Sequence, residues 1–552
     1  MNEISTEVKR MGLLDFYLAL LVAAIILIKR LLISRYGINP ESPREIQNIL
    51  NVLNGGLIYK DFFWYHGFFP VYWHALIFKT FSPEIYYVRL FVTIFATVAS
   101  FFAYWIARNF LSPGMSVCVS LLGFTGLIVT EHGSGEMMAF CCITVSFYYL
   151  LQYCNYSQNR SIYFAGLIGG VTSLVQVLPL GMMAFVGGMF AIACYSFFGD
   201  KKSWGNIKIF LIGYIPIPLM SYGFLAYIVT PGKLIKSVVP FFTSGESAEL
   251  APSSLISISV PSLLPVISFG QSLQNLISNL NKYLFVNLRW WMIVLVFAWG
   301  LTEFLLSWKR KKLSKSKLLS MGTLILYGPL FETKSLLIAG PNGLTSTYIN
   351  MLPTYILLFY LIRQRFSLKR FPSALAMGFL LIYFLYPFAK YYNYFSKNAV
   401  PLNMPYSKFI AVSPYKYDLY HKTVDYIKSN TEEDDSIVFS GVNHFFSIFS
   451  GRNEVFKNDV TTFVRTSMHP ANKIVGLSNI ASDAEKKVIN AIERFGAKLI
   501  LLPDSSHLYS DTNNSPYLSY LDRQWKKVIR IGDDSLLNPF DHEPAIFIYE
   551  RK

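Results

Sequence analysis

Charged residues are scarce in this sequence, and their scarcity restricts the class of protein before any motif is considered. Only 15% of its 552 residues are Asp, Glu, Lys or Arg, whereas 53% are hydrophobic and 16% are aromatic. Soluble proteins carry about 25% charged residues. The composition therefore excludes a cytosolic globular enzyme and an intrinsically disordered chain, and it indicates a membrane protein with several spans and an attached soluble part.

Cysteine is also rare, and its distribution argues against disulfide or metal chemistry. The five cysteines lie within or at the edges of apolar runs: Cys118, Cys141, Cys142, Cys154 and Cys194. Such residues are typical of a membrane core, and no disulfide framework or CxxC metal site is predicted.

Acidic residues are sparse in the hydrophobic part of the chain, which gives the sequence its net charge of +16. The first 400 residues hold 31 basic and 14 acidic residues, whereas the remainder holds 18 and 19. A basic excess can indicate nucleic-acid binding. Here it follows short loops between apolar runs, as the positive-inside rule expects, so we predict a membrane and no nucleic acid as partner.

Long apolar runs predict about eleven transmembrane helices, since a span needs about 20 apolar residues. The candidate spans are 12–34, 86–108, 112–130, 137–154, 162–178, 180–197, 207–229, 288–307, 316–332, 343–362 and 372–391. No small-residue cleavage site follows the first run, so it is not a removable signal peptide. The interiors of these spans are nearly free of charge, with Asp15 and Glu303 near the ends.

The basic clusters also predict the orientation of the chain. Clusters such as Lys309–Lys317 and Arg363–Arg370 fall on one side only if residues 66–83 do not cross the bilayer. We therefore expect 66–83 to form a helix on or in the outer face. This gives an integral plasma (inner) membrane protein with a cytoplasmic N-terminus and an extracytoplasmic C-terminal domain.

Residues 1–392 are predicted to form the membrane domain, with an outer-face loop at 36–85 and a long outer loop at 230–287. Within the first loop, residues 44–54 carry Ile46, Ile49, Leu50 and Leu53 on one helical face, which predicts an amphipathic surface helix ending at Gly55-Gly56.

Residues 393–552 change to the composition of a small soluble α/β domain. The pattern predicts helices at 419–430 and 482–496 and strands at 436–441, 498–504 and 545–550. This part contains no GxGxxG, Walker A or HExxH motif. We therefore predict no catalytic role for it.

Two groups of titratable residues are predicted on the outer side. Charges near membrane depth are costly and often functional, although loops are also where carboxylates are simply tolerated. The first group surrounds the surface helix: Glu41, Glu45, Lys60, Asp61 and His66. The second lies in a short turn between two spans: Glu131, His132 and Glu136.

The stretch 40–90 resembles the first outer loop of the GT-C superfamily of membrane glycosyltransferases, which includes the protein O-mannosyltransferases and the lipid A aminoarabinose transferase. The matching motifs are Pro40-Glu41-Ser42, Asn54-Gly55-Gly56, Tyr59-Lys60-Asp61-Phe62-Phe63, His66-Gly67, Pro70-Val71-Tyr72 and Arg89-Leu90. Residues 163–176 resemble a Gly-rich span of that superfamily, and the tail is similar to the C-terminal domain of its bacterial members. The resemblance implies a GT-C-like polytopic α-helical fold with a small C-terminal α/β domain.

The resemblance also implies a reaction, the inverting transfer of a sugar from a polyprenyl-phosphate donor to a lipid, glycan or protein acceptor on the outer face. A carboxylate would take the proton of the acceptor hydroxyl, and we expect Glu41 in this role, with Glu131 or Glu136 as helper or alternate. A cation would hold the leaving phosphate. The candidates for contacts with substrate or phosphate are Lys60, Asp61, His66, His132, Lys334 and Tyr348.

Some positions depart from the superfamily pattern and leave alternatives open. The usual acidic pair is replaced by Glu41-Ser42, which is compatible with an inactive scaffold. The late histidine is missing, and Tyr348 stands nearest its position. The alternative for Asp61 is a structural role in closing a turn. The alternative for Lys60 is that its side chain merely extends toward lipid headgroups.

Two further alternatives concern a metal and transport. Glu131, His132 and Glu136 could hold a divalent ion, but without a supporting Asp-x-Asp motif we expect no cofactor. A transporter predicts internal repeats and charges near the middle of spans, and the sequence shows neither clearly.

Overall fold

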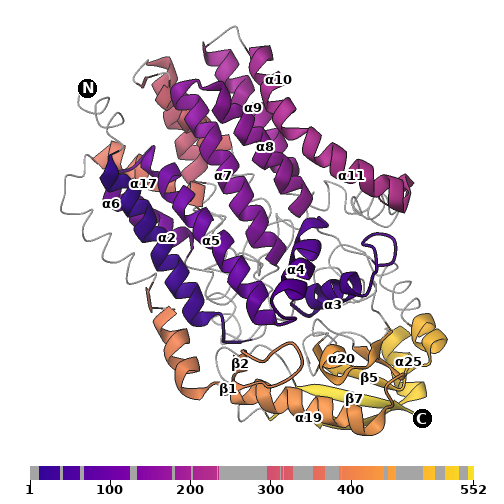
Figure 1. Cartoon of the computed structure of the whole chain (residues 1–552). Helices are drawn as coiled ribbons and strands as arrows, with labels where there is room; N and C mark the ends of the chain where they lie inside the picture. Colours follow the sequence, from indigo (N-terminus) through magenta and orange to yellow (C-terminus); the bar gives the residue numbers. More distant parts are fainter. Residues whose placement is uncertain are drawn as a thin grey trace, which may run out of the picture.

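The structure is a computed structural model in which a helical bundle is joined to an α/β part, with two short helices between them (Figure 1). It describes residues 12–37, 42–62, 67–124, 134–176, 181–199, 203–232, 234, 295–310, 313–314, 316–326, 352–366, 385–386, 388–439, 445–455, 489–503, 516–533 and 545–552.

The helices of the bundle coincide with the apolar runs of the sequence. They are α2 (Leu13–Ile33), α5 (Ile85–Arg108), α6 (Pro113–Gly123), α7 (Ser134–Tyr156), α8 (Asn159–Val175), α9 (Met182–Gly199), α10 (Ser203–Tyr214), α11 (Pro216–Val229) and α17 (Leu352–Phe366). Among the described residues, four helical stretches are long and apolar enough to cross a membrane: Leu13–Ile33, Ile85–Arg108, Met137–Tyr156 and Gly205–Val229. The predicted total of eleven stays a prediction, because several of those runs lie partly outside the described residues.

The predicted span 207–229 is interrupted at Ile215, between α10 and α11. Proline has no backbone N–H to donate and its ring obstructs the preceding turn, and Pro216 and Pro218 both follow the interruption. The axis of α11 is accordingly inclined to that of α10 (Figure 1).

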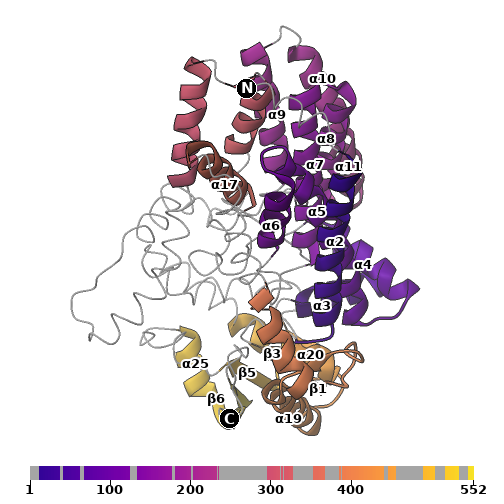
Figure 2. The ribbon, with the colours of Figure 1, turned by 90° about the vertical axis from the view of Figure 1, so that its left-hand side faces the viewer.

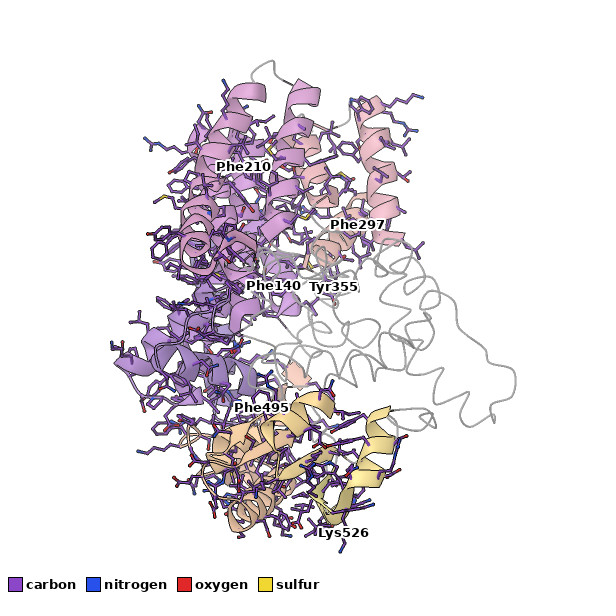
Figure 3. All side chains as sticks on the ribbon, turned by 90° about the vertical axis from the view of Figure 1, so that its right-hand side faces the viewer. Phe140, Phe210, Phe297, Tyr355, Phe495 and Lys526 are labelled. Carbon is purple, nitrogen blue, oxygen red and sulfur yellow. The ribbon has the colours of Figure 1, made fainter. Side chains whose placement is uncertain are left out.

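Close backbone contact between α8 and α10 explains the Gly-rich stretch. A Cβ at Gly166 would lie 2.3 Å from the carbonyl oxygen of Phe210, and one at Gly170 would lie 2.6 Å from that of Tyr214. Small residues spaced four apart allow membrane helices to approach in this way. Phe210 itself is fully buried within the bundle (Figure 3).

The short helices α3 (Ser42–Leu53) and α4 (Phe69–Thr80) lie between the bundle and the α/β part (Figure 1). We call the end of the bundle at which they lie the loop end. With 12 residues, α4 is about 18 Å long and too short to cross a bilayer core of about 30 Å. This agrees with the prediction that 66–83 does not span, while the side of the membrane stays a prediction.

The helix predicted at 44–54 is present as α3, but it does not lie free on a surface. Ile46 and Ile49 are buried, and the helix packs against α4 and also contacts α20 (Phe445–Ser450). The predicted helix and its apolar face are thus confirmed, whereas the elements that cover this face were not predicted, because periodicity identifies an apolar face but not what covers it. Its predicted end is confirmed, since Gly55 adopts a φ of +86° directly after the last turn.

The α/β part contains a five-stranded sheet in the order β4-β3-β5-β7-β6. The strands are β3 (Ser436–Phe439), β4 (Asn453–Glu454), β5 (Leu499–Pro503), β6 (Trp525–Ile531) and β7 (Ile546–Arg551). β3 is parallel to β4 and β5, whereas β7 is antiparallel to β5 and β6. The strands predicted at 436–441, 498–504 and 545–550 are thus confirmed.

The sheet is the middle of three layers. Ile437 and Phe439 belong to the core shared with α19 (Pro414–Asn430) and α20, whereas Val438 packs on the other face with α25 (Pro516–Gln524) and residues 489–495. Successive side chains of β3 thus point to opposite faces of the sheet, as in any strand, and both faces are covered. The predicted helix 419–430 lies within α19, and the domain boundary at 392/393 stays a prediction.

Candidate functional site

A tight turn after α3 carries two of the predicted site residues, Lys60 and Asp61. One carboxylate oxygen of Asp61 accepts a hydrogen bond of 2.8 Å from the backbone N–H of Leu57. The backbone N–H of Asp61 donates in return to the carbonyl of Leu57, also at 2.8 Å. Asp61 therefore closes the turn, as the alternative interpretation predicted, and the side chain of Lys60 is left exposed.

The same turn is anchored in the protein by Tyr59, which is buried with a φ of +66°. Its neighbours in the local core include Val71 of α4 and Leu225 and Val229 of α11. Burial raises the pKa of Tyr59 well above its ordinary value, and the nearby hydroxyls of Tyr222 and Tyr72 add to the effect. The exposed Lys60 is thus directly preceded by Tyr59, whose side chain is fixed in this local core.

Gly67, the residue after His66, is held against the C-terminal end of α8. Its backbone N–H donates to the carbonyl of Val175 at 3.0 Å. A Cβ at this position would lie 1.9 Å from the carbonyl oxygen of Leu174, so no side chain fits. The glycine of the His66-Gly67 motif is therefore required by close backbone approach.

The start of α7 lies beside the start of α4. A Cβ built on the buried Gly135 would lie 3.2 Å from Cγ of Pro70. Gly135 directly precedes Glu136 of the second predicted group, and Pro70 follows the His66-Gly67 motif. The turn predicted near 131–136 is wrong for residues 134–136, because α7 already begins at Ser134. The structure thus brings together the two stretches that the sequence marked separately.

The exit of α2, which leads toward Glu41, is held by Arg89 of α5. Its guanidinium donates to the carbonyl oxygens of Ser34 at 2.9 Å, Gly37 at 2.8 Å and Tyr36 at 3.3 Å. In the sequence Arg89 entered only as part of the Arg89-Leu90 motif. The structure shows that it caps the carbonyl end of α2.

Two buried cations near the loop end of α2 were missed. Lys29 and Arg30 are 4% and 6% exposed, and the ammonium of Lys29 donates to the carbonyl of Phe124 at 3.1 Å. Phe124 follows α6 and precedes the stretch that contains Glu131. The prediction that span interiors are nearly free of charge overlooked this pair, which the Lys-Arg dipeptide inside an apolar run signals.

The remaining predicted site residues cannot be positioned in this way. Six of them lie outside the described residues: Glu41, His66, Glu131, His132, Lys334 and Tyr348. Glu136 lies in the first turn of α7, but its side chain is outside the described part of the structure. Within the described part of the chain, no group of three or more His, Cys, Asp or Glu could hold a metal ion. The roles of these residues stay predictions.

A groove with a volume of about 550 Å³ lies in the α/β part, between α19 and the end of β6. Tyr426 and Asp425 line it from the helix, and Arg530 and Asp533 line it from the strand and the following residues. None of its lining residues belongs to the loop end of the bundle.

Comparison with known proteins identifies the fold. No protein-family model matches the chain, and no curated protein matches it. Among solved structures, the chain is similar to the apo form of the oligosaccharyltransferase of Archaeoglobus fulgidus, with a TM-score of 0.50 and 12% identity over 88% of this chain and 69% of that one.

Two further solved structures are similar at lower scores. ArnT from Cupriavidus metallidurans, bound to undecaprenyl phosphate, has a TM-score of 0.41 and 10% identity over 97% of each chain. The arabinofuranosyltransferase AftD from Mycobacteria has a TM-score of 0.41 and 11% identity over 97% of this chain and 40% of that one. The likeness to the apo oligosaccharyltransferase confirms the GT-C-like fold that was expected from the sequence.

Proposed function

We propose that this chain is an integral membrane glycosyltransferase that transfers a sugar from a polyprenyl-phosphate donor to an acceptor on the outer face of the membrane. The observation that carries the proposal is the meeting of the motif-bearing segments at the loop end of a bundle with a GT-C fold. Gly67 packs against the C-terminal end of α8, and Gly135 at the start of α7 packs against Pro70 at the start of α4. A reaction between a lipid phosphate and a water-soluble group needs such an end, since lipid and water meet there.

In this proposal Glu41 is the general base. It stands one residue before α3 and four residues after Gly37, which Arg89 holds. The carboxylate accepts the proton of the acceptor hydroxyl as that oxygen attacks the anomeric carbon, so the configuration at that carbon inverts. Glu131 and Glu136 are the alternates, because Gly135, which directly precedes Glu136, packs against Pro70 at the start of α4.

The leaving group is the polyprenyl phosphate, and a fixed cation lowers the energy of the charge that develops on it. Lys60 is the candidate among the described residues because its side chain is exposed on an anchored turn. His66 and Lys334 are further candidates from the sequence, as are His132 and Tyr348 for contacts with substrate. No metal or other cofactor is required for these steps.

The test is release of undecaprenyl phosphate from a panel of undecaprenyl-phosphate sugars, measured by mass spectrometry with the purified protein in lipid nanodiscs. We expect Glu41→Gln to lower the rate at least a hundredfold, because a general base contributes about 10²–10⁴. The matched control is Glu432→Gln, an exposed carboxylate of the α/β part, which should keep the full rate. Full activity of Glu41→Gln would move the base to Glu131 or Glu136.

A second candidate function, an inactive GT-C-like scaffold, is favoured by one observation, the serine at position 42 in place of a second acid. The same assay separates the two. A scaffold releases no undecaprenyl phosphate from any donor of the panel, with or without cell-envelope extract as acceptor, whereas the enzyme does so with at least one.

A further inference from the structure

The backbone at the exit of α2 is paired with the α/β part. The N–H of Ala411 donates to the carbonyl of Arg35 at 2.7 Å, and the N–H of Gly37 donates to the carbonyl of Ala411 at 2.8 Å. Tyr36 and Ala411 are thereby partners in a parallel bridge. Ala411 belongs to β2 (Ala411–Val412), which pairs with β1 (Val400–Pro401). The exit of α2 therefore extends a small sheet of the C-terminal part.

The start of α5 is held by the same C-terminal segment. A carboxylate oxygen of Glu84 accepts from the N–H of Lys408 at 2.9 Å, and the N–H of Ile85 donates to the carbonyl of Tyr406 at 2.9 Å. The ring of Phe409 lies 5.5 Å from that of Tyr86. Because Arg89 stands one turn further along α5, the segment fixes both the exit of α2 and the helix that caps it.

A third contact joins the α/β part to the helix that follows. α20 contacts α3, and the buried face of α3 belongs to the same hydrophobic core as Phe445 and Phe446 of α20. Figures 1 and 2 both show α20 directly beneath α3. The chain on either side of residues 38–41 is thus attached to the C-terminal part, at Arg35–Gly37 before them and at α3 after them.

We propose that the α/β part is a positioning element for the first loop, acting through Ala411 and α20, so that detaching the exit of α2 from Ala411 slows sugar transfer. This inference rests on the proposed function and deepens it. The sequence predicted no catalytic role for this part of the chain. A part that only covers the bundle would make contacts there without controlling the rate of the reaction.

The test weakens the pairing at one atom. Ala411→Pro removes the N–H that donates to Arg35, because proline has no backbone donor. The matched control is Glu433→Pro, at the second position of the turn whose ends, Glu432 and Asp435, are joined by a backbone hydrogen bond, where proline fits. We expect hydrogen exchange in peptides covering residues 30–50 to accelerate in Ala411→Pro only, and its kcat to fall roughly ten- to hundredfold with the donor KM little changed.

A second measurement keeps the inference testable where Ala411→Pro does not fold. Cysteines replace Tyr36 and Ala411 in a chain whose five natural cysteines are replaced by serine, and one preparation is assayed before and after oxidation. Retention of the transfer rate in the oxidised form supports the inference, since the pairing is then the active arrangement. Loss of transfer on oxidation, reversed by reductant, overturns it.

The failure of this inference is separable from that of the proposed function. If Ala411→Pro exchanges and transfers as the unmodified chain does, the positioning role is overturned and the transferase stands. If the unmodified chain transfers no sugar, the proposed transferase function is wrong, and no effect on a transfer rate can be measured. The exchange comparison needs no substrate and still reports whether Ala411 holds the exit of α2.

Discussion

At the scale of single residues, the loop end is fixed by hydrogen bonds whose acceptors and donors can be removed one at a time. We expect Asp61→Ala to destabilise the protein by about 0.5–1.5 kcal/mol, because the N–H of Leu57 loses its acceptor. Asp61→Asn should lose less stability, since the amide oxygen of asparagine can still accept the hydrogen bond from Leu57. Thermal unfolding of the two variants in the same detergent measures the difference, and equal midpoints for alanine and asparagine would contradict the turn-closing role.

His74 of α4 provides a prediction about pH. Burial lowers the pKa of His74 from 6.5 to about 3, so the folded protein keeps this imidazole neutral. The unfolded chain takes up a proton below pH 6.5, which makes the unfolded state more favourable as the pH falls. Between pH 6.5 and 5 we expect stability to decrease with a slope from this group that rises to about 1.4 kcal/mol per pH unit near pH 5.

The comparison for His74 is a variant without a titrating group at the same place. In His74→Leu this contribution is absent, so the difference in unfolding midpoint between the two proteins should change between pH 7 and pH 5. Parallel curves over that range would show that the imidazole does not stay neutral in the folded state.

At the scale of helices and turns, close approach at Gly67 couples the first loop to α8. We expect Gly67→Ala to destabilise the fold by about 3 kcal/mol, because a Cβ 1.9 Å from the carbonyl oxygen of Leu174 forces the backbones apart. Gly205→Ala in α10 is the control, since nothing lies within 4 Å of that position and alanine favours a helix. The unfolding midpoint should fall in the first variant only; a fall of equal size in both would reject the contact.

The helices of the membrane part could be predicted from the sequence because a run of apolar residues is a signal contained in one segment. α2 and α5 were predicted to within one residue at each end. β6 could not be predicted, because five successive residues from Lys526 to Arg530 are exposed and show no alternation. An edge strand of this kind is defined by its partner β7, which comes later in the sequence.

At the scale of the whole molecule, the candidate site depends on contacts between distant segments that no local pattern contains. The sequence identified His66-Gly67 and Glu131–Glu136 as separate groups, and only the fold places Gly135 beside Pro70. The charge distribution is different, since it predicts a global property from composition alone. Basic loops favour the cytoplasmic side because they resist translocation, and the α/β part is therefore predicted to lie outside.

The orientation can be tested with one cysteine on each side of the predicted membrane. In a chain without its natural cysteines, Ser314→Cys and Ser429→Cys introduce thiols at exposed positions, next to a basic cluster and on α19 respectively. An impermeant maleimide should label Ser429→Cys in intact cells, whereas Ser314→Cys should react only after permeabilisation. Because a lipid-linked donor displayed outside can be used only by an outward-facing site, the reverse pattern of labelling would also remove the basis for transfer at the outer face.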